Sequence, residues 1–348
     1  KAGATSYKQL LKIANEQCEE MIFSVQCIKQ YGYSNTRNIT YGNRCTAGSM
    51  WNNYLPNPHF VESFETATGE KFNWDNYLPG YSAMKEKERV VFFLRDGLSA
   101  AEKERMAAYG ADMSKYLDSG NEARIKKAYE SRDPRLQMAV ITPYAQYNGA
   151  SSGIAHTYTL RWPYRGSDSA EPFDIRTDTN DKFYYLWRKF VPEGLEQTER
   201  DTYGLDIPLI RYAEVLLLKA EALNEWGSTH ESEAIRCVNE VRRRAGHVEL
   251  NNATYPATKV NGQSDLRERI RNEYYWEIGG EDSMYFHELR WGTWKDKKFD
   301  NNRNGLMQMW GETTYTWYWL GDQCWSWPIP AKEMEMNSNL EQNEGWIN

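Results

Sequence analysis

The chain has 348 residues, of which 42 are Lys or Arg and 49 are Asp or Glu, so its formal net charge is −7. This acidic balance argues against a general nucleic-acid binder, because such a protein needs a concentrated basic face. No segment holds the roughly 20 apolar residues that a membrane-spanning helix requires. The five Cys residues lack C-x-x-C spacing, so neither a zinc site nor a disulfide framework is indicated.

Aromatic residues are unusually frequent in this sequence, with 14 Trp, 24 Tyr and 11 Phe. A Trp side chain is large, and its N–H needs a partner when the ring is buried. We therefore expect many of these rings to lie at least partly exposed, where they can stack on a ligand.

The sequence of residues 1–130 predicts a helix followed by an aromatic, loop-rich region. Apolar spacing predicts the helix over 6–20, and the apolar run 21–26 predicts a short buried strand. Periodicity disappears over 31–81, a stretch rich in Asn, Gly, Pro and aromatic rings, which indicates a long irregular loop of the kind that often carries function. The run 90–94 predicts a second strand.

The middle of the chain carries clear helix boundaries and then turns to strands. Ser99 and Glu102 form the S-x-x-E capping-box pattern that opens a helix. Asn121 begins another helix, which must end before Pro134. Residues 135–205 are typical of strands and loops.

After Pro208 the pattern becomes helical. Pro208 suits the first helical position, and an apolar stripe continues to Gly227; a second helix ends at Gly246. Small residues at the crossing of these two helices are typical of a tetratricopeptide unit. Further helices are predicted over 264–278 and 284–291. The predicted fold is mainly α, with tetratricopeptide-like helical hairpins packed against an irregular loop-rich region with a few short strands.

A Gly149-x-Ser151-x-Gly153 pattern matches the nucleophile elbow of hydrolases. An elbow needs a helix after the Ser, whereas the residues after Gly153 alternate like a strand. The pattern therefore predicts a Gly/Ser hairpin turn.

Two carboxylate pairs, Glu273/Glu277 and Glu281/Asp282, are candidates for the general acid and base of a glycoside hydrolase. Because 49 acidic residues make such pairs common, we expect Glu273 and Glu277 to pair instead with nearby Arg267, Arg269 and Arg271. The five His residues have no metal-ligand spacing.

Asp300, Asn302 and Asn304 followed by Gly305 reproduce the start of a calcium-binding loop. The closing acidic residue is expected at position 311, which is Gly. A polar Asn/Gly loop is therefore the alternative, and no metal or other cofactor enters the predicted function.

Five ordered segments resemble the SusD/RagB family of outer-membrane nutrient-binding lipoproteins. These segments are Glu20–Val25, Asp133–Leu136, Ile210–Ala222, Ile270–Gly292 and Trp327–Trp346. Members of that family usually run well beyond 348 residues. The resemblance therefore implies that the chain is the C-terminal two-thirds of such a protein, with residues 131–348 forming the family's C-terminal region in one compact unit with the preceding part.

The resemblance implies a non-catalytic, cell-surface glycan-binding protein of the bacterial outer membrane of the Bacteroidetes type. Such a protein delivers oligosaccharide to a TonB-dependent, SusC-like transporter and is attached to the membrane only by a lipid anchor upstream of this chain. A peptide-binding member of the same uptake family, a glycoside hydrolase and a scaffold that binds only proteins are the alternatives.

The ligand site is expected on the aromatic loops, because a ring covers the apolar face of a sugar while amide and guanidinium groups bind its hydroxyls. We predict Trp51 and Trp74 as stacking platforms, Tyr77 as a flanking ring, and Arg44 and Asn53 as hydroxyl partners. The alternative for each ring is that it fastens a long loop to the core.

Overall fold

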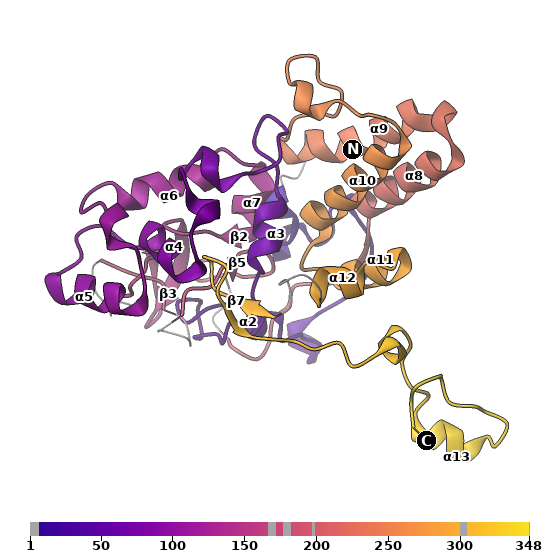
Figure 1. The fold of residues 1–348 in the computed structure, drawn as a ribbon. Helices are drawn as coiled ribbons and strands as arrows, with labels where there is room; N and C mark the ends of the chain where they lie inside the picture. The colour runs from indigo at the N-terminus through magenta and orange to yellow at the C-terminus, as the bar shows by residue number, and fades with distance from the viewer. Residues whose placement is uncertain (1–6, 166–171, 177–181, 197–198, 300–304, 348) are drawn as a thin grey trace. The chain divides into compact units, whose positions relative to one another are not determined.

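A computed structural model describes residues 7–165, 172–176, 182–196, 199–299 and 305–347 (Figure 1). Their contacts divide the chain into two units. The first comprises residues 1–281 with 307–312, and the second comprises 282–306 with 313–348. The domain boundary expected after residue 130 stays a prediction, and it is not where these contacts divide the chain.

Helices dominate the first unit, so the mainly α prediction is confirmed. Its helices are α1 (Tyr7–Leu10), α2 (Arg37–Tyr41), α3 (Pro58–Ser63), α4 (Glu86–Phe93), α5 (Ala100–Tyr109), α6 (Asn121–Glu130), α7 (Pro134–Ala139), α8 (Tyr212–Trp226), α9 (Glu231–Ala245) and α10 (Gln263–Ile278). Its strands are β1 (Met21–Val25), β2 (Val140–Ile141), β3 (Gln146–Ser151), β4 (Ile154–Thr159), β5 (Leu186–Trp187) and β6 (Ile207–Arg211). They pair antiparallel as β1 with β6, β2 with β5, and β3 with β4.

The helix predicted over 6–20 is wrong in extent. Only α1 and a single 3-10 turn at Ile13–Asn15 form, because Lys12 between them is extended, with φ −122° and ψ 147°. That backbone directs the Lys12 ammonium to the carbonyl of Val191, which accepts a hydrogen bond at 2.9 Å.

The strand predicted over 21–26 is confirmed as β1, but its burial is not. Phe23 is 57% exposed, because β1 and β6 form an isolated two-stranded sheet. Pro208 lies in β6 opposite Ser24, an edge position that tolerates a residue without an N–H. The helix predicted to start at Pro208 therefore begins at Tyr212.

The strand predicted over 90–94 is wrong, because this run is the buried end of α4. A short apolar run does not by itself distinguish a strand from a helix buried on all sides. The deciding signal lies upstream, where the Glu88 carboxylate accepts a hydrogen bond from the Lys85 backbone N–H at 2.9 Å and caps the helix.

The helix boundaries predicted in the rest of this unit agree with the structure. The Ser99–Glu102 capping box forms at the start of α5, and α6 begins at Asn121. Helices α8 and α9 end at Gly227 and Gly246, and α8, α9 and α10 pack together through small buried residues such as Ala220 (Figure 1).

Buried ion pairs connect α10 to the rest of the first unit. Arg242 Nε donates to Glu273 Oε2 at 2.9 Å, Arg211 Nη1 donates to Glu277 Oε1 at 2.9 Å, and Arg244 also pairs with Glu277. Both carboxylates are fully buried.

The nearby partners predicted for Glu273 and Glu277 are therefore wrong. Arg267, Arg269 and Arg271 pair with Glu225, Asp265 and Glu268 instead. Glu281, the other hydrolase candidate of this unit, is ion-paired with Arg211 and Lys189. Glu273, Glu277 and Glu281 are thus engaged in structural ion pairs.

The second unit is small and rich in tryptophan. Its helices are α11 (Ser283–Trp291), α12 (Trp294–Lys298) and α13 (Ala331–Met336), and β8 (Thr313–Tyr315) follows β7 (Leu306–Met307) along the chain. Trp294, Trp319 and Trp325 contact one another with ring centroids 5.3–6.3 Å apart. Near the end of the chain, the Gln342 amide donates to the Ile329 carbonyl at 2.9 Å and accepts from its N–H at 2.7 Å.

Candidate ligand-binding pocket

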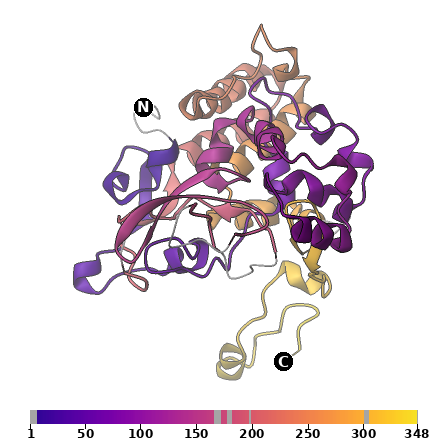
Figure 2. The ribbon, with the colours of Figure 1, turned by 90° about the vertical axis from the view of Figure 1, so that its left-hand side faces the viewer.

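The G-x-S-x-G segment is the turn of the β3–β4 hairpin, as predicted. Ser151 pairs with Ile154, and Ser152 and Gly153 between them have φ angles of 51° and 75°. Two successive left-handed residues are the geometry of a tight two-residue hairpin. A strand and not a helix follows Ser151, so the nucleophile elbow does not form (Figure 2).

A compact loop over residues 43–50 packs against this hairpin. The Asn43 carboxamide oxygen accepts a hydrogen bond from Cys45 N at 2.9 Å, and Thr46 N–H donates to the Asn43 carbonyl at 3.0 Å. The Cys45 carbonyl in turn accepts from Ala150 N in β3 at 2.8 Å. A Cβ at Gly149 would lie 2.2 Å from the Cys45 oxygen, so this close approach requires glycine.

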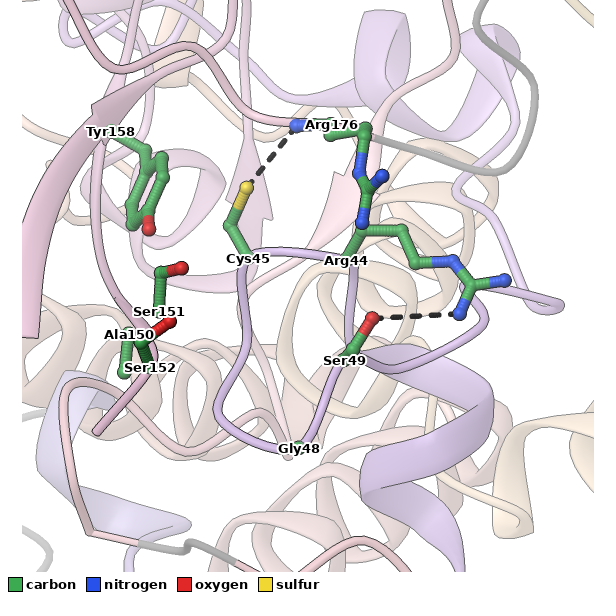
Figure 3. A pocket seen from close by; sticks show the side chains of 9 residues that line it. All are labelled: Arg44, Cys45, Gly48, Ser49, Ala150, Ser151, Ser152, Tyr158 and Arg176. Carbon is green, nitrogen blue, oxygen red and sulfur yellow. Dashed lines mark hydrogen bonds between the residues drawn. The ribbon is translucent and has the colours of Figure 1, made fainter. Parts of the chain in front are cut away.

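Between the loop and the hairpin lies a pocket of about 270 Å³ (Figure 3). Figure 3 shows the two arginines on one side of it and the hairpin residues on the other. The described residues that line it are Arg44, Cys45, Gly48, Ser49, Ala150, Ser151, Ser152, Tyr158 and Arg176. Its lining is thus mostly polar, with an aromatic ring from β4.

The two arginines that line the pocket, Arg44 and Arg176, lie on backbone segments that are hydrogen-bonded to each other. Arg44 N–H donates to the Arg176 carbonyl at 3.2 Å, and Arg176 N–H donates to Cys45 Sγ at 3.2 Å. The Arg44 guanidinium also lies 3.5 Å from the Ser49 hydroxyl. Backbone pairing therefore brings two guanidinium groups from distant parts of the sequence to one pocket.

Trp51 lies beside the pocket and remains accessible, with 44% of its surface exposed. The guanidinium of Arg200 lies over its ring, 4.6 Å from the centroid. The backbone of Arg200 lies against the pocket wall, since a Cβ at Gly48 would be 3.4 Å from the Arg200 Cα. Asn53, two residues after Trp51, is exposed.

Trp74 and Tyr77 have a different environment. Trp74 is only 7% exposed, stacks on Tyr81 at 4.7 Å, and donates its indole N–H to the Glu62 carboxylate at 2.7 Å. Tyr77 is half-buried, stacks on Phe72, and shares a 2.7 Å hydrogen bond with the Ser131 hydroxyl. Trp74 therefore offers no free face for a sugar in this structure.

Of the five predicted ligand residues, the structure places Arg44 in the pocket and Trp51 beside it. The sequence reasoning missed Arg176, Arg200 and the serines of the hairpin turn. The turn itself was found from its glycines, but nothing in a single sequence indicates that residues 44–49 pack against it.

The described residues contain no cluster of three or more His, Cys, Asp or Glu side chains that fits a metal ion, and the five Cys residues are free thiols. The calcium candidates Asp300, Asn302 and Asn304 lie outside the described residues. Within the described helices, none combines the length and the apolar character needed to cross a bilayer.

Comparison with known proteins gives the family. The model of the SusD family matches residues 19–346, so the chain belongs to this family. This result confirms the resemblance seen in the sequence. It also identifies the chain as a member of a family with carbohydrate-binding relatives.

Two characterised relatives match parts of the chain. A SusD-like protein from Formosa agariphila is 32% identical over 139 residues, which are 40% of this chain and 24% of that protein. The starch-binding protein SusD from Bacteroides thetaiotaomicron is 28% identical over 161 residues, or 46% of this chain and 25% of that protein. The matched regions thus span about a quarter of each relative.

Solved structures support the fold. A SusD-like protein from Bacteroides fragilis has a TM-score of 0.62 and 20% identity, over 98% of this chain and 57% of that one. A SusD-like carbohydrate-binding protein from the same species has a TM-score of 0.59 and 21% identity, over 98% and 58%. The chain therefore spans somewhat more than half the length of these structures.

Proposed function

We propose that this chain binds glycan without cleaving it, through the polar pocket between residues 44–49 and the β3–β4 turn together with the neighbouring Trp51 ring. The observation that carries the proposal is the combination of an accessible indole with a pocket lined by hydroxyl and guanidinium donors. Sugar binding requires such a combination, because each pyranose presents both an apolar C–H face and a rim of hydroxyls.

The positions of the buried carboxylates favour a binding protein over a hydrolase. Glu273 and Glu277 are buried in pairs with arginines, and the described pocket lining holds no Asp or Glu. A glycoside hydrolase needs two carboxyl groups facing the scissile bond across a cleft.

Membership of the SusD family supports the wider setting of this proposal. We place the protein at the bacterial outer membrane, on the extracellular face, held there by a lipid anchor. In that position it hands oligosaccharide to a TonB-dependent, SusC-like transporter. Co-purification of the protein from its native membrane with a barrel transporter tests this partnership, and consistent absence of a transporter would contradict it.

Binding itself is tested by affinity-gel electrophoresis and calorimetry of the purified chain with a polysaccharide panel. We expect at least one polymer to retard the protein and Trp51→Ala to weaken that binding about tenfold, which corresponds to about 1.4 kcal/mol and lies within the roughly 0.5–3 kcal/mol that stacking on an aromatic side chain contributes. Trp226→Ala is the matched control, because Trp226 is exposed on α8 and contacts only His230 among described rings.

Four outcomes would contradict the proposal. If no polymer retards the protein, the proposed glycan binding is wrong. If the protein releases reducing ends from a polymer, it is a hydrolase. If Trp51→Ala and Trp226→Ala change the affinity equally, the protein binds glycan but its binding site is not at Trp51. Binding of peptides alone would favour a peptide-uptake role.

A further inference from the structure

The backbone of Trp51 is fastened to the end of α2. The last carbonyl groups of a helix lack partners within the helix and need donors from elsewhere. Trp51 N–H donates to the Ile39 carbonyl of α2 at 2.9 Å, and Asn52 N–H donates to the carbonyl of Gly42, which follows α2, at 2.7 Å. The position of the Trp51 backbone is therefore set by hydrogen bonds within the protein.

Asn52 bends the chain directly after Trp51. It is buried, and its backbone is left-handed with φ 45°. Left-handed backbone is unfavourable for most residues, and Asn adopts it more readily than most residues other than glycine. After the bend, Tyr54 N–H donates to the Thr40 carbonyl of α2 at 3.0 Å. The conformation of Asn52 thus allows the residues on both sides of it to pair with the same helix end.

Left-handed residues are concentrated at this site. Among the described residues, six other than glycine have a positive φ, and three of them, Ser49, Asn52 and Ser152, line the pocket or adjoin Trp51. Such residues persist only where the surrounding structure holds them, and they cluster at binding sites and active sites. The concentration indicates a preformed site and not a loop that adapts to its ligand.

Arg200 holds the ring of Trp51. Its guanidinium carbon lies 4.6 Å from the ring centroid, which is a cation–π contact. The backbone of Arg200 is fixed in turn, because the Asn38 carboxamide of α2 donates to its carbonyl at 3.2 Å and a Cβ at Gly48 would lie 3.4 Å from its Cα. The guanidinium covers one face of the indole, so a sugar can stack only on the other face.

We propose that Asn52 and Arg200 are positioning residues for glycan binding. Asn52 directs the backbone of Trp51, and Arg200 holds the indole with one face open beside the pocket. This inference rests on the proposed function, since it explains how the same site is kept ready for its ligand. A preorganised site binds more tightly, because the ring need not be ordered when the ligand arrives.

A pair of substitutions at Asn52 tests the role of the backbone. The affinity is measured by calorimetry with a polymer that retards the unmodified protein. Asn52→Gly adopts left-handed backbone without strain, so we expect an affinity within about twofold of that of the unmodified protein. Asn52→Ala makes this conformation unfavourable, and we expect the affinity to fall about threefold or more. Both variants lose the carboxamide and differ by one methyl group, so their difference reports the backbone conformation.

Substitutions at Arg200 test the contact with the ring. We expect Arg200→Gln to weaken binding about threefold or more, and Arg200→Lys to retain most of the affinity because an ammonium group also interacts with an indole face. Arg236→Gln is the matched control, since the Arg236 side chain is 59% exposed on α9 and Arg236 does not line the pocket. Thermal unfolding of each variant shows that it is folded.

The same substitutions in Trp51→Ala separate positioning from a general structural role. If Asn52 and Arg200 act through the indole, Asn52→Ala and Arg200→Gln have no further effect on the affinity once the ring is absent. If they weaken binding equally with and without the ring, they act on the fold as a whole, and the positioning role is wrong.

The outcomes also separate this inference from the proposed function. If Trp51→Ala weakens binding while Asn52→Ala and Arg200→Gln bind as tightly as the unmodified protein, the glycan site stands and the positioning role is wrong. If no polymer binds the unmodified protein, or Trp51→Ala leaves its affinity unchanged, the proposed function fails at this site, and this inference fails with it.

Discussion

Trp51 and Trp74 show how differently two residues of the same aromatic stretch are used. Trp51 keeps an accessible face beside the pocket, with Arg200 over its ring. Trp74 is enclosed by other rings, and Glu62 accepts its indole N–H. The alternative stated for each ring, that it fastens a loop to the core, describes Trp74.

Stability measurements on the two tryptophans test this difference. Trp74→Ala is expected to lower the free energy of unfolding by about 3–5 kcal/mol, because it leaves a large cavity and removes the partner of Glu62. Trp51→Ala is expected to lower it by about 1 kcal/mol or less, since an exposed ring contributes little burial. Urea denaturation followed by far-ultraviolet circular dichroism measures both, and equal losses would contradict the assigned environments.

At the scale of elements, α10 is held by charge as well as by packing. The Glu277 carboxylate of α10 forms ion pairs with Arg211 at the end of β6 and with Arg244 of α9. Nη1 of Arg135 in α7 lies 3.3 Å from Oε2 of the same carboxylate. Although burial raises the pKa of Glu277, Arg244, Arg211 and Arg135 together hold it well below its ordinary value. This one carboxylate therefore connects three elements that lie far apart in the sequence.

Removing that charge should be costly. Glu277→Gln is expected to lower the free energy of unfolding by about 3–5 kcal/mol, because it leaves buried guanidinium groups without their counter-ion. The control is Glu233→Gln at the surface of α9, whose pair with Lys219 is half exposed and contributes less than about 1 kcal/mol. If chemical denaturation gives similar losses for both variants, the Glu277 network is not a determinant of stability.

The elements also show where sequence patterns suffice. Capping residues and terminal glycines located α5, α6, α9 and α10 within a residue or two, because these signals act within one turn of helix. The strand prediction over 90–94 is wrong, because apolar residues there are compatible with either structure and the deciding signal, the capping contact of Glu88 with Lys85, lies upstream of the run.

At the scale of the whole molecule, buried carboxylates predict a sensitivity to acid. Burial raises the pKa of Glu65, Asp133 and Glu281, but hydrogen bonds and neighbouring cations outweigh it and hold each pKa below its ordinary value. Lys189 is the opposite case, since burial lowers its pKa to about 8 although Glu281 acts against this change.

The direction of the pH effect follows from the protons bound in each state. Unfolded Glu and Asp titrate near 4.5 and 3.8, above the folded carboxyls, so the unfolded chain binds more protons as the pH falls below about 4.5. The stabilisation is complete above that pH and is lost as the pH falls through the folded values. We expect the free energy of unfolding to decrease steadily below about pH 4.5, with a smaller pH dependence in Glu277→Gln. A flat profile between pH 6 and 3.5 would contradict this expectation.

The amino-acid sequence by itself determined the starts of α5 and α6, the ends of α8 and α9, the β3–β4 turn and the family, because caps, turn glycines and ordered motifs are local and can be read residue by residue. Only the tertiary structure decided which rings are accessible, which arginines meet Glu277, and that Arg44, Arg176 and the hairpin serines share one pocket. The pocket depends on contacts between segments more than a hundred residues apart, such as Arg44 with Arg176 and Cys45 with Ala150. The pairing of separate elements is set by the packing of the whole core and leaves no periodic signal in the chain.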